Sequence, residues 1–186
     1  WFEILLKKNG MTNKDVKITN MSADDAAAAF MADRLPVAVT WEPHLTLAKK
    51  ANKGKVLVDS SESPGVIVDV VELSCDYIKN NPKDVEALVK GLYKANELIK
   101  SDQTKAYEVM AKGVGGWLKD PKDFASSAAG VNFYDEARNK EFFKDGKDGE
   151  AGKLVTLGGE VWSSMQKLKM DVKYDDIVDT SFLGAK

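Results

Sequence analysis

The predicted fold is organised around residues 35–43, which read Leu35-Pro36-Val37-Ala38-Val39-Thr40-Trp41-Glu42-Pro43. The run Val37–Val39 is apolar, β-forming and too short for a helix, so it predicts a buried strand. Pro43 disfavours a helical backbone at Glu42, so the chain leaves the strand extended and turns. In open α/β sheets, ligands gather at the carboxyl ends of the strands. The stretch therefore predicts a strand whose end presents Trp41 and Glu42 to a ligand. The alternative is a core tryptophan followed by a solvated glutamate.

Composition and charge exclude several classes of function. The chain has 186 residues, which suits one domain or two small lobes. Its net charge of −2 gives no electrostatic basis for binding nucleic acid or an anionic membrane. Cys75 is the single cysteine, so no intrachain disulfide can form. His44 is the single histidine, which disfavours a zinc site and a serine–histidine triad. We therefore predict no metal, no cofactor and no catalytic residue.

The segments around this stretch predict an α/β fold. Residues 15–21 alternate apolar and polar side chains, as a strand does. Ser22 then opens an alanine-rich helix that continues to Arg34, before the strand over 37–41. Strand, helix and strand in this order predict a right-handed crossover and a parallel pair. A short helix is expected over 44–52.

Two further strands are predicted over 55–59 and 66–71. The second of them is the most apolar β-branched run in the chain and carries one carboxylate, Asp69. A lone acid inside a buried strand costs free energy unless it is paired or faces a cleft. Asp69 is therefore expected to have either a structural partner or a ligand.

From Ser74 onward the sequence predicts helices. The pattern Asn81-Pro82-Lys83-Asp84 starts a long amphipathic helix that continues to about Lys100. Further helices are expected after Ser101, after Asp120-Pro121, around Phe142-Phe143, and from Gly159 to about Lys169. A short extended piece is expected over 131–135. The loop over 144–150 is rich in glycine and charge, but it lacks the ligand spacing of an EF-hand and is expected to be solvent-exposed.

The start of the sequence predicts that the chain is a fragment. Residues 1–10 resemble the last turns of a helix that closes at Gly10, without an N-cap, an initiator methionine or a signal peptide. The alternative is a chain that simply begins at a frayed terminus. For a fragment, we expect an exposed apolar surface, and either self-association or binding of the missing N-terminal segment of the same protein.

The order of these pieces resembles solute-binding proteins of the nitrate/sulfonate/taurine ABC importer class, which include relatives that bind thiamine-precursor pyrimidines. The resemblance covers nearly the whole chain. It rests on residues 15–18 before the alanine-rich helix, 38–43 (Ala-Val-Thr-Trp-Glu-Pro), 64–70, 131–135 (Val-Asn-Phe-Tyr-Asp) and 177–182 (Ile-Val-Asp-Thr-Ser-Phe).

The resemblance implies a fold like the type II periplasmic binding proteins, with a parallel or mixed sheet flanked by helices. The chain would be an incomplete two-lobed clamshell: residues 1–64 would form most of the second lobe, and residues 65–186 the crossing strand and the C-terminal helices of the first. It also implies a periplasmic or extracellular protein, with a membrane-anchored lipoprotein as one form, and an ABC importer permease as its membrane partner.

The resemblance further implies an interlobe site for a small polar solute of the amine, sulfonate or pyrimidine type. Trp41 would pack on the solute, Glu42 and Asp69 would accept hydrogen bonds, and Thr40 and Ser61 would be secondary contacts. Two acids around a tryptophan favour an amine, an amidinium or an aminopyrimidine over a plain anion.

Two other classes of function stay open. One is an enzyme of pyrimidine-precursor synthesis on a related fold, in which His44 beside Glu42 would act as a general base. The small number of catalytic groups, one cysteine and one histidine, argues against an enzyme. The other is a helical interaction module over residues 76–130, which would bind a partner without residues 1–65.

Overall fold

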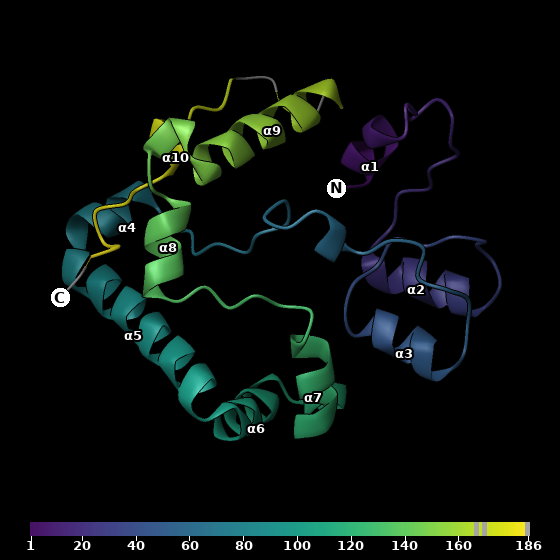
Figure 1. The fold of residues 1–186 in the computed structure, drawn as a ribbon, viewed down its shortest axis with the longest axis horizontal. Helices are drawn as coiled ribbons and strands as arrows, with labels where there is room; N and C mark the ends of the chain where they lie inside the picture. Colours follow the sequence, from purple (N-terminus) through teal and green to yellow (C-terminus); the bar gives the residue numbers. More distant parts are fainter. Residues whose placement is uncertain (166–167, 169–170, 185–186) are drawn as a thin grey trace. The chain divides into compact units, whose positions relative to one another are not determined.

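The computed structural model describes residues 1–165, 168 and 171–184. These residues form two compact units, Trp1–Ile67 with Ser126–Gly130, and Val68–Ala125 with Val131–Lys186. Figure 1 shows the helices in chain order: α1 Phe2–Lys8, α2 Ala23–Met31, α3 His44–Lys50, η1 Ser60–Glu62, α4 Cys75–Asn80, α5 Pro82–Ser101, α6 Gln103–Val114, η2 Gly116–Leu118, α7 Pro121–Ala128, α8 Glu136–Phe142, η3 Gly146–Asp148, α9 Glu150–Ser164 and α10 Tyr174–Ile177. The predicted division into lobes at residue 64 stays a prediction.

The predicted α/β sheet is wrong for this structure, because no described residue belongs to a strand. The segments 15–21, 37–41, 55–59 and 66–71 are extended or irregular, and their backbone–backbone hydrogen bonds join close neighbours in the sequence. A strand needs a second strand to accept and donate its ladder bonds. Without one, most of the large apolar side chains of these segments are exposed, Leu57 by 78%, whereas Val68 packs against the hydrophobic cluster of the second unit. The short extended piece predicted over 131–135 is neither helix nor strand.

Most predicted helix starts are confirmed. Ser22 caps α2 through its hydroxyl, which accepts a hydrogen bond from the Asp25 backbone N–H at 3.1 Å. Pro82 and Pro121 are the first residues of α5 and α7. Proline fits this position because its missing N–H has no partner there anyway. Gly10 follows α1 with a φ of +69°, a backbone region that glycine adopts without strain.

Two predicted helix starts were misplaced. Ser101 is the last residue of α5, and Asp102 caps α6 by accepting from the Lys105 backbone N–H at 3.0 Å. Helix α9 begins at Glu150 rather than at Gly159, so its glycines lie inside the helix. Its predicted end at Lys169 lies outside the described residues.

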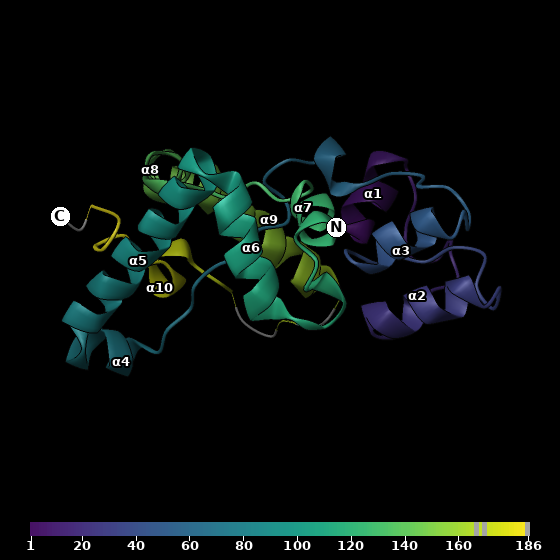
Figure 2. The same ribbon diagram turned by 90° about the horizontal axis from the view of Figure 1, so that it is seen from below.

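In the first unit, α2 and α3 lie side by side and run in the same direction (Figures 1 and 2). The His44 Nε2 atom lies 2.7 Å from Asp24 Oδ1 near the start of both helices. The Lys53 ammonium contacts both carboxylate oxygens of Asp33, at 2.7 and 2.5 Å, just beyond their ends. Gly54 has a φ of +68°, and a Cβ atom there would lie 2.6 Å from the Phe30 ring. A glycine at this position therefore allows the chain after α3 to approach α2 closely.

The second unit has its hydrophobic cluster around Phe142, Ala151 and Tyr174, which are all buried. The Phe142 ring makes edge-on contacts with Tyr134 and Phe143, with centroid distances of 5.7 and 5.1 Å. Such edge-to-face pairs add to the free energy of burial. This cluster joins α8, α9 and α10. Among the described helices, none is long and apolar enough to cross a membrane.

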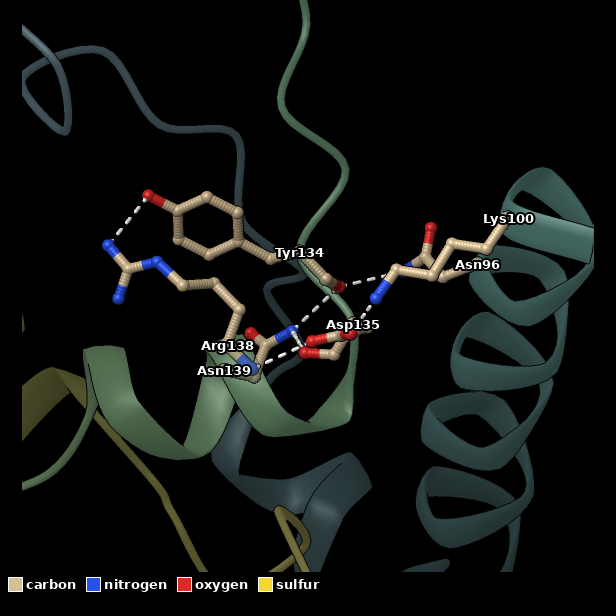
Figure 3. Close-up of polar contacts among 6 residues, drawn as sticks. All are labelled: Asn96, Lys100, Tyr134, Asp135, Arg138 and Asn139. Carbon is tan, nitrogen blue, oxygen red and sulfur yellow. Dashed lines mark hydrogen bonds and ion pairs between the residues drawn. The ribbon is translucent and has the colours of Figure 1, made fainter. Parts of the chain in front are cut away.

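A polar network connects α5 to the start of α8 (Figure 3). The side-chain amides of Asn96 and Asn139 both donate to the Tyr134 carbonyl oxygen, at 2.7 and 2.9 Å. Asp135 caps α8 by accepting from the Arg138 backbone N–H at 2.7 Å, and it forms an ion pair with Lys100. The network gives the carbonyl oxygens of Tyr134 and Asp135 side-chain partners, because the Asn139 amide also donates to the Asp135 carbonyl oxygen.

Asp135→Asn is expected to flatten the acid side of the stability–pH profile. The Lys100 ammonium and the Arg138 backbone N–H both donate hydrogen bonds to Asp135, and they hold its pKa below its ordinary value of 3.8. A depressed pKa contributes stability above the ordinary value, and this contribution is lost as the pH falls through the folded-state pKa. Denaturant melts between about pH 7 and about pH 2 measure it. If the unfolding free energies of the wild type and the variant fell equally at acidic pH, this role for Asp135 would be contradicted.

Candidate functional site

Thr40 and Glu42 hold the backbone on both sides of Trp41. The Thr40 hydroxyl donates to the carbonyl oxygen of Ala23, the first residue of α2, at 3.1 Å. One carboxylate oxygen of Glu42 accepts from the Thr46 backbone N–H in the first turn of α3, at 3.0 Å. Such a carboxylate satisfies a helix N–H that has no partner within the helix. Both residues were predicted as ligand contacts, and this stays a prediction. In the structure they tie the segment between α2 and α3 to both helices.

Trp41 itself lies on the surface, with 67% of its area exposed. Its carbonyl oxygen accepts from the Leu45 backbone N–H at 3.3 Å, so its backbone continues directly into α3. The alternative interpretation, a core tryptophan, is therefore wrong in this structure. A large aromatic ring that is exposed on a tethered backbone offers an apolar platform to a ligand.

Ser61 lies in a tight turn of its own. Its backbone N–H and its hydroxyl both donate to Asp59 Oδ1, the former at 3.0 Å. These two bonds hold the pKa of Asp59 below its ordinary value, because they stabilise the charged carboxylate. The Ser61 hydroxyl would have to leave this bond, or share it, to donate to a solute.

The four predicted contacts described so far lie within a segment that a family model matches. They are Thr40, Trp41, Glu42 and Ser61. The model of the NMT1-like family matches residues 1–114, which is more than half of the chain. The chain belongs to the NMT1-like family. No curated protein and no solved structure matches it significantly.

NMT1-like proteins are nitrate/sulfonate/taurine-type solute-binding proteins, so the resemblance inferred from the sequence is confirmed. Most members of the family bind solutes and are not enzymes. The family works with ABC transporters and is typically periplasmic or extracellular. Family membership thus shows a solute-binding role in the broad sense.

Asp69, the fifth predicted contact in this NMT1-like chain, belongs to the second unit. It is exposed and makes no hydrogen bond or ion pair with any residue that the structure describes. Exposure removes the free-energy cost that was expected for an acid in a buried strand. Its role as a ligand contact stays a prediction. Within the described ranges, no three His, Cys, Asp or Glu side chains gather as metal ligands would.

The first unit also has a surface hollow of about 450 Å³, which none of the predicted contacts lines. Its lining residues lie along and beside one face of α2: Met21, Asp25, Ala28, Ala29, Ala32 and Arg34. The spacing 25, 28, 29 and 32 is that of one helical stripe, so the sequence carried a signal for this face. The Asp24–His44 ion pair was also missed, because its partners are 20 positions apart and belong to different helices.

Proposed function

We propose that this chain is the solute-binding component of an ABC importer, and that it binds a small polar solute at Trp41. The observation that carries the proposal is the exposed Trp41 ring on a segment that Thr40 and Glu42 tie to two helices. Because the backbone of this segment is already fixed, ligand binding need not order it, and only the side-chain freedom of Trp41 is lost. The segment lies inside the range that matches the NMT1-like family.

Glu42, next to Trp41 in the sequence, favours a solute that carries an amine, an amidinium or an aminopyrimidine. Glu42 follows Trp41 directly, and only one of its carboxylate oxygens has a described partner. A cation over the face of a tryptophan is attracted by the ring, and a carboxylate accepts a charge-assisted hydrogen bond from it. Ser61 is proposed as a further contact; Asp69, which belongs to the second unit, stays a predicted acceptor. A sulfonate that also bears an amine, such as taurine, would meet the same groups through its amine.

A calorimetric and thermal-shift panel tests this function on the protein as its source produces it. The panel contains small primary amines, taurine, aminopyrimidines, nitrate and sulfate. We expect binding of at least one amine-bearing member, and unfolding free energy that rises by roughly 2.7 kcal/mol at one hundred times its Kd. Nitrate and sulfate, which carry no donor group, should give no shift. Binding of nitrate or sulfate alone would overturn the preference for amines, and no binding by any member would overturn the site.

A further inference from the structure

Residues 55–59, Lys-Val-Leu-Val-Asp, lie between α3 and η1 and form neither helix nor strand (Figure 1). The backbone N–H and carbonyl groups of residues 55–58 make no hydrogen bond with any residue that the structure describes. Leu57, the middle residue, is 78% exposed, and Val56 is exposed as well. An open backbone that carries exposed apolar side chains can pair with an extended segment of another chain. This segment is therefore a surface for strand addition.

The charges at the two ends of the segment indicate which chain fits it. Lys55 and Asp59 each lie two positions from Leu57, on opposite sides. When two copies pair antiparallel about Leu57, Lys55 of each copy lies opposite Asp59 of the other. Opposite charges that face each other across two strands stabilise the pair, and like charges destabilise it. A parallel pair in register would place lysine against lysine and aspartate against aspartate, so the charges favour the antiparallel arrangement.

We propose that two copies of this chain associate through residues 55–59, as an antiparallel pair with Leu57 on the two-fold axis. In such a contact each copy contributes the same residues, so the segment has to be complementary to itself. The charges also fix the register, because a slip by one residue separates both Lys55–Asp59 pairs. This association needs no solute and is independent of the proposed function.

Both charged side chains are available to a second copy. Lys55 is exposed, and its ammonium forms no ion pair within the part of the chain that the structure describes. Asp59 is also exposed, and the hydroxyl and the backbone N–H of Ser61 both donate to its Oδ1 atom, which leaves Oδ2 for the lysine of the second copy. A lysine usually protects an open edge from pairing. In the antiparallel arrangement Asp59 of the other copy neutralises it.

Sedimentation equilibrium of the whole chain over a concentration series tests the association. We expect the average mass to rise from that of one chain toward that of two as the concentration increases, because a contact this small belongs to the weak interfaces. Leu57→Lys should abolish the rise, since it places two like charges opposite each other on the axis. Its side chain is exposed, so the substitution leaves no cavity in the fold.

Val70→Lys is the matched control for the loss of an exposed apolar side chain. Val70 is 67% exposed on another segment that is neither helix nor strand, and it has no place in the proposed contact. This variant should associate as the wild type does. If Val70→Lys and Leu57→Lys reduced association equally, the self-association would be a general effect of exposed apolar side chains, and the proposal would be overturned.

Exchange of the charges tests the pairing of Lys55 with Asp59. Lys55→Glu alone and Asp59→Lys alone should each weaken self-association on the order of tenfold, because two symmetry-related pairs become repulsive. An equimolar mixture of the two variants should associate again, since every pair in the mixed dimer joins opposite charges. Circular dichroism checks that both variants fold, because Asp59→Lys also removes the side chain that caps η1. Two folded variants that do not associate when mixed would refute the register.

Disulfide crosslinking with diamide distinguishes antiparallel from parallel pairing. The exposed Cys75 is first replaced by serine in every variant. Leu57→Cys then places both thiols on the axis, where paired Cα atoms lie about 4.5–5.5 Å apart, within the range of a disulfide. Lys55→Cys places them roughly 13 Å apart along the pair, too far for a bond. We expect a crosslinked dimer of the first variant and none of the second.

Two outcomes of these measurements would overturn the proposal. Equal crosslinking of Leu57→Cys and Lys55→Cys would indicate a parallel or unspecific contact. A wild-type chain that stays monomeric at every concentration would mean that a second copy does not cover Leu57. Amide hydrogen exchange of residues 55–58 in that monomer would then tell whether a different segment covers them, because amides that are hydrogen-bonded in a strand pair exchange slowly.

Discussion

Gly152→Ala is expected to destabilise the second unit by about 3 kcal/mol, the upper part of the range for overpacked sites. Gly152 is a buried residue in the first turn of α9. A Cβ atom there would lie 2.0 Å from the carbonyl oxygen of Lys147 and 2.2 Å from its carbonyl carbon. These are backbone atoms of η3, which cannot rotate away as a side chain can. Either α9 or the preceding loop must move, and Ala151 beside it belongs to the hydrophobic cluster.

Gly158→Ala in the same helix is the matched control. No described heavy atom outside its own helix and chain neighbours lies within 4 Å of a Cβ built there. Alanine is favoured over glycine inside a helix by about 1 kcal/mol, so this variant should be more stable than the wild type. Urea denaturation of both variants measures the difference. If Gly152→Ala also stabilised the protein, the close packing of α9 on η3 would be wrong.

The helices could be predicted because their signals are local. Ser22 before two acids, and proline after Asn81 and Asp120, act within one helical turn, where side chain and backbone meet whatever the rest of the chain does. The start of α6 shows the limit of this reasoning. Ser101 and Asp102 are adjacent and both suit an N-cap, and the aspartate is the one that accepts the helix N–H.

The predicted strands failed because strand formation is not local. Alternating or continuous β-branched residues, as in 15–21 and 66–71, show only that a segment could be extended. Whether it becomes a strand depends on a partner that supplies ladder hydrogen bonds, and no described segment supplies one to these residues. The exposed apolar side chains of Leu57, Ile67 and Val70 are the physical consequence.

The candidate site also has a part that could be predicted from the sequence and a part that could not. The exposed Trp41 and its neighbours Thr40 and Glu42 could be found from a short motif, because the motif itself carries the aromatic and the carboxylate. The hydrogen bonds of Thr40 and Glu42 to Ala23 and Thr46 could not be predicted from the motif, since they depend on how α2 and α3 pack. The same holds for Asp24 and His44, which the sequence places 20 positions apart.

Trp41→Ala is expected to weaken solute binding by roughly 1–3 kcal/mol, the scale of a lost aromatic contact in a binding site. This corresponds to a loss in affinity of about 5- to 150-fold. The unfolding free energy should change by less than about 0.5 kcal/mol, because an exposed side chain leaves no cavity. Calorimetric titration with the amine that binds best in the panel, and a urea melt, measure both quantities on one purified variant.

Trp162→Ala provides the control for the loss of a surface tryptophan. Trp162 lies on α9 and is 52% exposed, close to the 67% of Trp41, but no site residue is proposed near it in the sequence. Its variant should bind the amine as the wild type does. A core tryptophan would instead lose roughly 3–5 kcal/mol of stability when it is truncated. If Trp41→Ala showed that loss of stability while the molecules still folded kept their affinity, Trp41 would be a packing residue, and the proposed binding site would have to be sought elsewhere in the chain.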